Sequence, residues 1–194
     1  MHQPSKALQH LRNGDVIIYP SESCYSFGCD AKNKEAVEKI HEIKHEGNDK
    51  AFILNVNDLI QLKDFGILND VAIALCTHFM PGALTLIIDK KEKYPHLSTD
   101  GIAFRILSNE TARTLAKEFG SALVTTSVNL HGEKPLYTIS DVKKQFGHHV
   151  SYIIDKGDLK ETVQQSTIFD TRTNTVLREG ALTSKEIYDF LKNE

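Results

Sequence analysis

Residues 15–30 read DVIIYPSESCYSFGCD, and this stretch joins an apolar run to a segment rich in hydroxyl side chains. The run from Val16 to Tyr19 has the β-branched character of a buried strand, and Pro20 ends it. Along the rest of the chain, similar short apolar runs alternate with segments of helical period. This alternation predicts an α/β or α+β fold.

The predicted elements follow from apolar periodicity and from cap residues. The sequence favours strands at residues 15–19, 51–56, 84–88, 101–106, 123–126 and 152–155, and a hairpin at 167–170 and 175–178. It favours helices at residues 6–12, 34–44, 69–79, 109–120, 140–146 and 183–191, with a short one after Asp58. Asn69 and Asn109 are expected N-caps, Gly47 is expected to close the second helix, and Thr183 has the capping-box spacing to Glu186. No repeat or linker divides the chain, so a single domain over residues 1–194 is expected.

Charge and apolar content exclude several classes of protein. The 194 residues carry 23 Lys and Arg against 26 Asp and Glu, a net charge of −3, which gives no overall attraction to nucleic acid. No apolar run approaches the roughly 18 residues that cross a bilayer, and the first residues lack the features of a secretion signal. We therefore expect a cytoplasmic protein that binds no membrane. Cys24, Cys29 and Cys76 lack metal-finger spacing and are expected to be free thiols.

Three hydroxyl-rich segments that follow predicted strands are the most informative feature. They are residues 19–30, 125–129 and 165–167. Polar side chains at strand ends bind small molecules where several ends meet, although the same residues also serve as ordinary turn formers. Arg105 lies within a predicted strand, where an unpaired charge is costly, so either a protein carboxylate or a ligand anion must face it.

Residues 41–45, HEIKH, match the H-E-x-x-H pattern of zinc hydrolases. The pair lies in the last turn of its predicted helix, and no second motif supplies a third ligand. We interpret the match as coincidence and expect no metal site in the protein itself.

The hydroxyl-rich segments and the cations around them resemble the YrdC/TsaC family, the threonylcarbamoyl-AMP synthases, in its short single-domain bacterial form. The likeness covers nearly the whole chain in order: YPSESCY (19–25), FGCD (27–30), EIK (42–44), KAFIL (50–54), PGALT (81–85), IAFR (102–105), TSVN (126–129), STIFD (166–170) and LREG (177–180).

This resemblance implies a twisted mixed sheet with flanking helices around a large concave cleft. It also implies an enzyme that joins L-threonine, bicarbonate and ATP, with Mg²⁺, into threonylcarbamoyladenylate and releases pyrophosphate. The product would serve tRNA modification through transient contact with a separate threonylcarbamoyl transferase complex. An anionic carbamate must meet an anionic triphosphate, which requires cations, and no covalent nucleophile is needed.

The resemblance also implies roles for individual residues. Those expected to bind ATP are Lys44, Lys50, Ser127, Asn129, Tyr137 and Arg178, and those expected to bind threonine are Ser21, Ser23, Tyr25, Arg105 and Ser166.

The clearest departure from the family is Glu46, which stands where the family has an arginine. Several placements are open: Glu46 faces solvent, it helps hold Mg²⁺, or His45 or Lys50 takes over the missing cation's task. On this basis Lys44→Ala is expected to abolish adenylate formation, and Glu46→Arg to leave it intact or improve it. Ser26, where the family has glycine, is a second departure if its backbone needs a positive φ angle.

Two alternatives remain open from the sequence. One is a diverged relative that binds a nucleotide or RNA without synthase activity because of Glu46. The other is the zinc hydrolase suggested by residues 41–45.

Overall fold

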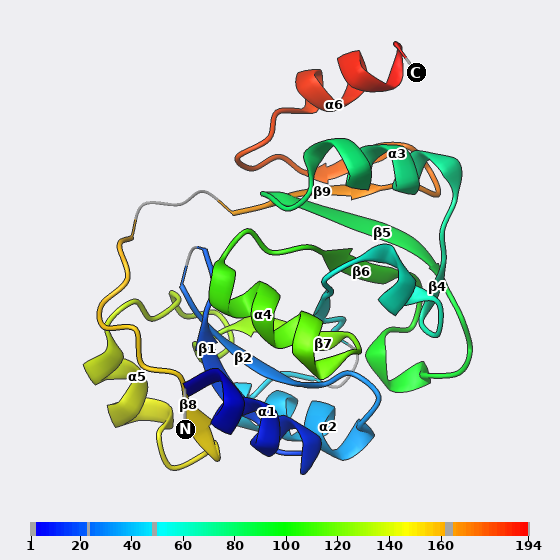
Figure 1. Cartoon of the computed structure of the whole chain (residues 1–194). Coiled ribbons are helices and arrows are strands. Elements are labelled where there is room, and N and C mark those ends of the chain that lie inside the picture. The colour runs from blue at the N-terminus through cyan, green and yellow to red at the C-terminus, as the bar shows by residue number, and fades with distance from the viewer. Residues whose placement is uncertain (1–2, 23, 48–49, 162–164, 194) are drawn as a thin grey trace.

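The computed structural model describes residues 3–22, 24–47, 50–161 and 165–193. Within them, ten strands form a mixed sheet in the order β10-β9-β5-β6-β3-β7-β2-β1-β8, and β4 pairs with β5 beside this path. The strands are β1 (Ile17–Pro20), β2 (Tyr25–Asp30), β3 (Ile53–Asn55), β4 (Gly66–Ile67), β5 (Leu84–Lys90), β6 (Ile102–Arg105), β7 (Leu123–Ser127), β8 (Tyr152–Ile153), β9 (Thr167–Asp170) and β10 (Thr175–Arg178). The predicted combination of a mixed sheet with flanking helices is confirmed (Figure 1).

The helices are α1 (Gln3–Arg12), α2 (Lys34–Lys44), α3 (Asp70–Phe79), α4 (Glu110–Phe119), α5 (Ile139–Phe146) and α6 (Ser184–Leu191), with short 3₁₀ turns η1 (Leu59–Leu62) and η2 (Pro95–Leu97). The predicted caps are confirmed: Asn69 accepts from Ala72 N–H, and Asn109 accepts from Ala112 N–H. Thr183 and Glu186 form the predicted capping box.

Strand β1 shows how the sheet separates two apolar layers. Ile17 and Tyr19 pack with α1 and α4, whereas Val16 and Ile18 face the larger core that includes α2. Successive side chains of a strand point to opposite faces, so one short run serves both layers. Figure 1 shows α3 and α6 at the β9 end of the sheet, and α5 and β8 at the other end.

Two local expectations were wrong. Tyr25–Asp30 is strand β2, which pairs antiparallel with both β1 and β7, and is not a turn. Helix α2 ends at His45, which adopts a left-handed conformation with φ 52°, and not at Gly47. Ser26 lies inside β2 and is not among the described residues with positive φ, so the absence of glycine there is no obstacle.

Strand pairing places the site-bearing strands side by side in the sheet. Strand β3 runs parallel to β6 and antiparallel to β7, and β7 pairs with β2 so that Ser127 lies opposite Ser26. On the other side of β6, β5 pairs with β9, which follows Ser166. Among the described residues, no helix has both the length and the apolar character required to cross a bilayer.

Candidate functional site

A cavity of about 480 Å³ lies over one face of the sheet, where Ile53 of β3, Ala103 of β6 and Thr125 of β7 lie side by side in its lining. Its walls come from segments far apart in the sequence, between Ser21 and Arg178. Six of the residues predicted to bind substrates line it: Ser21, Lys50, Arg105, Ser127, Ser166 and Arg178. The sequence-based expectation that hydroxyls and cations converge in one hollow therefore agrees with the structure.

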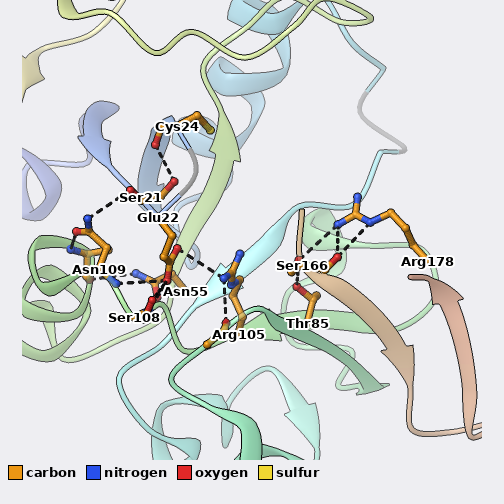
Figure 2. A network of polar contacts seen from close by, with 12 residues as sticks. Ser21, Glu22, Cys24, Asn55, Thr85, Arg105, Ser108, Asn109, Ser166 and Arg178 are labelled. Atoms are coloured by element: carbon orange, nitrogen blue, oxygen red, sulfur yellow. Dashed lines mark hydrogen bonds and ion pairs between the residues drawn. The ribbon is translucent and has the colours of Figure 1, made fainter. Parts of the chain in front are cut away.

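Arg105, the last residue of β6, lies at the centre of the polar network in Figure 2. Its Nη2 donates to the carbonyl oxygen of Gly82 at 2.9 Å, and its guanidinium lies 3.6 Å from a carboxylate oxygen of Glu22. The Nε of Arg105 is buried and has no hydrogen-bond partner among the described residues. Burial lowers the pKa of Arg105, and the charge of Glu22 partly opposes this. A protein carboxylate thus faces Arg105, but without direct hydrogen bonds, so guanidinium N–H groups remain for a ligand anion.

Glu22 is a further residue of the site. It lies within the YPSESCY motif, but the sequence predicted no role for it. One carboxylate oxygen of Glu22 accepts from Ser108 Oγ at 3.0 Å and from Asn109 N–H at 3.3 Å, at the start of α4. The other oxygen faces Arg105. Glu22 therefore ties Arg105 to a helix N-terminus, where a carboxylate is favoured by the exposed N–H groups.

Arg178 and Ser166 form the opposite wall (Figure 2). Arg178 donates to the carbonyl oxygen of Ser166 from Nη2 at 2.8 Å and from Nε at 3.2 Å. The hydroxyl of Ser166 pairs with that of Thr85 at 2.8 Å, and both residues are buried. Burial lowers the pKa of Arg178, and the positive charge of Arg105 lowers it further. Two guanidinium groups that repel each other at the same cavity favour an anionic ligand beside them.

Lys44 lies behind the cavity wall. Its Nζ donates to the carbonyl oxygens of Ser127 at 2.8 Å and Asn129 at 2.9 Å, and lies 3.4 Å from the Asn129 side-chain oxygen. The residue is only 2% exposed, and burial lowers the pKa of Lys44 to about 8. The three N–H groups of the ammonium therefore anchor the 127–129 loop.

Three other predicted residues lie away from the lining. The hydroxyl of Tyr25 donates to Gly157 O at 2.7 Å and accepts from Lys156 N–H, so it fastens β2 to a distant loop. Tyr137 is not part of the cavity lining, and burial raises the pKa of its phenol. Asn129 is buried behind the cavity wall and accepts from the Ser127 hydroxyl. Ser23 lies outside the described residues.

Glu46 is buried, with its side chain 1% exposed, which rules out the solvent-facing placement. Its carboxylate accepts from Lys50 Nζ at 2.7 Å and lies 3.6 Å from His131 Nδ1. Lys50 also lines the cavity, so Glu46 reaches the site through Lys50.

The H-E-x-x-H residues are arranged unlike a zinc site. His41 is buried and stacks on Phe52 with ring centroids 4.2 Å apart, whereas His45 lies beyond the end of α2. Within the described part of the chain, no three His, Cys, Asp or Glu side chains gather as metal ligands would.

Comparison with known proteins identifies the family. The Sua5/YciO/YrdC family model, whose description reads telomere recombination, matches residues 9–180. The threonylcarbamoyl-AMP synthase of Idiomarina loihiensis is 35% identical over an alignment of 173 residues that covers 86% of this chain and 92% of that protein.

Two solved structures have the same fold. P. abyssi Sua5 complexed with L-threonine superposes with a TM-score of 0.88 at 27% identity, covering 97% of this chain. This chain spans only 57% of that longer protein. E. coli YciO superposes with a TM-score of 0.82 at 29% identity, covering 95% of this chain and 92% of YciO. The resemblance stated from the motifs is confirmed, and the chain belongs to the Sua5/YciO/YrdC family.

Proposed function

We propose that this protein is a threonylcarbamoyl-AMP synthase, a nucleotidyltransferase that uses L-threonine, bicarbonate and ATP. The amine nitrogen of threonine attacks the carbon of bicarbonate, and water leaves to give the carbamate. A carbamate oxygen then attacks the α-phosphorus of ATP, and the bond to the β-phosphate breaks to release pyrophosphate. The chain is 35% identical to a relative with this name, which supports the assignment.

One structural observation carries the proposal: Arg105 and Arg178 line the same cavity as Lys50, and burial lowers the pKa of both arginines. Arginine remains protonated in proteins, so the lowered pKa values report a positive charge that its surroundings do not fully compensate. Carboxylate and phosphate groups supply that compensation. The reaction brings such groups together and needs their repulsion offset.

The predicted roles can be divided by position. Arg105 receives the threonine carboxylate through its free N–H groups, and Ser21 and Ser166 supply hydroxyls in the same cavity. Lys50 and Arg178 bind phosphates at the cavity wall. Lys44 contributes its charge and holds the 127–129 loop that faces the nucleotide.

Three of the residues predicted to bind substrates, Asn129, Tyr137 and Tyr25, do not line the cavity. Asn129 belongs to the nucleotide side of the proposal through the loop that Lys44 holds, and the assignment of Tyr137 to the nucleotide remains a prediction of the family resemblance. For Tyr25 the proposal leaves an indirect role, because its hydroxyl is bound to the 156–157 backbone.

Mg²⁺ belongs to this proposal as a companion of ATP. The described residues that line the cavity include no Asp or Glu, so they offer Mg²⁺ no carboxylate. We propose that the ion enters on the triphosphate and that the protein holds the complex through cations. Cytoplasmic location and contact with a transferase complex remain predictions of the same assignment.

The test is incubation with ATP, L-threonine, bicarbonate and Mg²⁺, measuring pyrophosphate and the adenylate. We expect pyrophosphate release that depends on threonine and bicarbonate and that Lys44→Ala abolishes. ATP binding without threonine-dependent pyrophosphate would instead support a diverged nucleotide-binding protein. RNA binding that weakens steeply with salt would support the RNA-binding alternative.

A further inference from the structure

We propose that Glu46 is a positioning residue, whose buried carboxylate holds the Lys50 ammonium at the cavity wall and locks the end of α2 to the 127–131 loop. The inference rests on the proposed function, because it concerns how the site binds the phosphates of ATP. It also explains how a chain with an acid at this position can use a triphosphate.

The backbone at the end of α2 turns the Glu46 side chain inward. His45 N–H donates to Glu42 O and Glu46 N–H donates to His41 O, both at 3.1 Å, while His45 is in the left-handed conformation. This pair of bonds is the Schellman motif, in which the residue after the left-handed position packs back against the last turn of the helix. Glu46 occupies that position, and its carboxylate lies 3.9 Å from His41 Nδ1.

The Glu46 carboxylate meets Lys50 in an asymmetric pair. The Glu46 side chain is 1% exposed, whereas that of Lys50 is 49% exposed, and the two atoms are 2.7 Å apart. Burial restricts the rotamers of the Glu46 side chain, whereas a half-exposed lysine has many rotamers available. Glu46 is thus the fixed partner that selects the position of Lys50.

The same carboxylate lies close to the loop that carries Ser127. His131 N–H donates to the carbonyl oxygen of Lys44 at 2.8 Å, and His131 Nδ1 lies 3.6 Å from the Glu46 carboxylate and 3.3 Å from Lys50 Nζ. Lys44 completes the connection through its bonds to the carbonyl oxygens of Ser127 and Asn129. Backbone and side chains therefore join the end of α2 to this loop at several points.

The charge of Glu46 also acts on Lys44. The groups that influence the Lys44 ammonium are Glu46, Lys50 and the thiol of Cys24, and the Phe27 ring lies beneath it with its centroid 5.8 Å from Nζ. Burial is the largest effect and lowers the pKa of Lys44 to about 8; Glu46 raises that pKa and Lys50 lowers it further. Removing Glu46 would therefore weaken the contribution of both lysines to ATP binding. Lys50 would lose its anchor, and the pKa of Lys44 would fall further, so that Lys44 loses its proton more readily.

The experiment is calorimetric titration of the full chain with ATP and Mg²⁺, without threonine, for Glu46→Gln, Lys50→Ala and the double variant. We expect each single variant to bind about tenfold more weakly, the effect of roughly one charge-assisted contact. At a pH low enough to keep Lys44 protonated in every variant, the double variant should bind no more weakly than Lys50→Ala alone, because both substitutions remove the same contact. Glu38→Gln is the matched control, since Glu38 also pairs at i,i+4 with a lysine of α2 but both side chains are well exposed.

The pH dependence separates positioning from general destabilisation. Affinity for ATP should fall at alkaline pH as Lys44 loses its proton. That fall should move to lower pH in Glu46→Gln and to higher pH in Lys50→Ala, because the two charges act on Lys44 with opposite sign. A variant that merely loosened the fold would not produce shifts in opposite directions.

Glu46→Arg gives a further test. It would place a third positive charge beside Lys44 and Lys50 in a site that is almost fully buried, so we expect weaker ATP binding. This reverses the sequence-based expectation that arginine leaves activity intact. Unchanged or tighter ATP binding in Glu46→Gln, or additive effects in the double variant, would overturn the inference alone. A parent chain that binds no ATP would overturn the proposed function as well.

Discussion

Replacing Arg105 by lysine should selectively weaken the use of threonine. The substitution keeps a positive charge opposite Glu22 but removes the planar fork that can bind a carboxylate through two N–H groups. In the structure, one N–H of Arg105 is bound to Gly82 O and Glu22 lies 3.6 Å away, so at least two donors remain for a ligand. Losing one charge-assisted hydrogen bond costs about 1.5–3 kcal/mol, which raises the KM for threonine about 10- to 150-fold.

The assay is threonine-dependent pyrophosphate release, with the KM for threonine and the KM for ATP measured separately. Arg172→Lys is the matched control, because Arg172 is a partly buried arginine bound to Asp100 and Asp170 and is not among the residues lining the cavity. We expect this control to leave both KM values unchanged. Equal rises in the two KM values for Arg105→Lys, or an unchanged KM for threonine, would refute the assignment of Arg105 to the threonine carboxylate.

Three further predictions concern stability, each measured by urea unfolding. Gly180→Ala should cost about 1–3 kcal/mol, since a Cβ there would lie 2.1 Å from Gln165 O; an unchanged midpoint would show that the backbone yields. Asn109→Ala removes the N-cap of α4 and should cost about 1 kcal/mol, with no loss expected if water replaced the cap fully. Hydrogen bonds from Arg172 lower the pKa of Asp170, so their stabilisation is present above the unfolded pKa of about 4 and is lost as the pH falls through the folded value. Asp170→Asn should therefore flatten the fall in the free energy of unfolding at acid pH, and an unaltered fall would contradict the prediction.

The parts of the fold that depend on local sequence were predictable. Asn69, Asn109 and Thr183 cap helices because a short polar side chain reaches the N–H groups of the next turn, whatever the rest of the protein does. Strand β2 was missed although its residues, YSFGCD, alternate in polarity, because its serine, glycine and aspartate are also typical turn residues. It pairs with β1 and β7 at its edges, and all of its residues except the last are buried, so both of its faces are covered.

The candidate site, like the fold, could be predicted from the sequence only in part. The convergence of Arg105, Ser127 and Arg178 in one cavity was expected, but its place was not: β6 and β7 run antiparallel, so Arg105 and Ser127 lie at opposite ends of their strands and the cavity lies over the sheet face between them. The inward turn of Glu46 could not be foreseen, since it depends on a left-handed histidine where glycine is usual and places the carboxylate beside His131 of a distant loop. Lys44 likewise has its carbonyl partners on a distant loop, which no local pattern indicates.

The most direct test of this account is a crystal structure of the protein with L-threonine and a non-hydrolysable ATP analogue bound together. We predict the threonine carboxylate within hydrogen-bond distance of the Arg105 guanidinium, and phosphate oxygens within reach of Arg178 and Lys50 in the same cavity. Ligands bound at separate places, or a threonine carboxylate away from Arg105, would contradict the claim that one hollow joins an amino acid to a nucleotide.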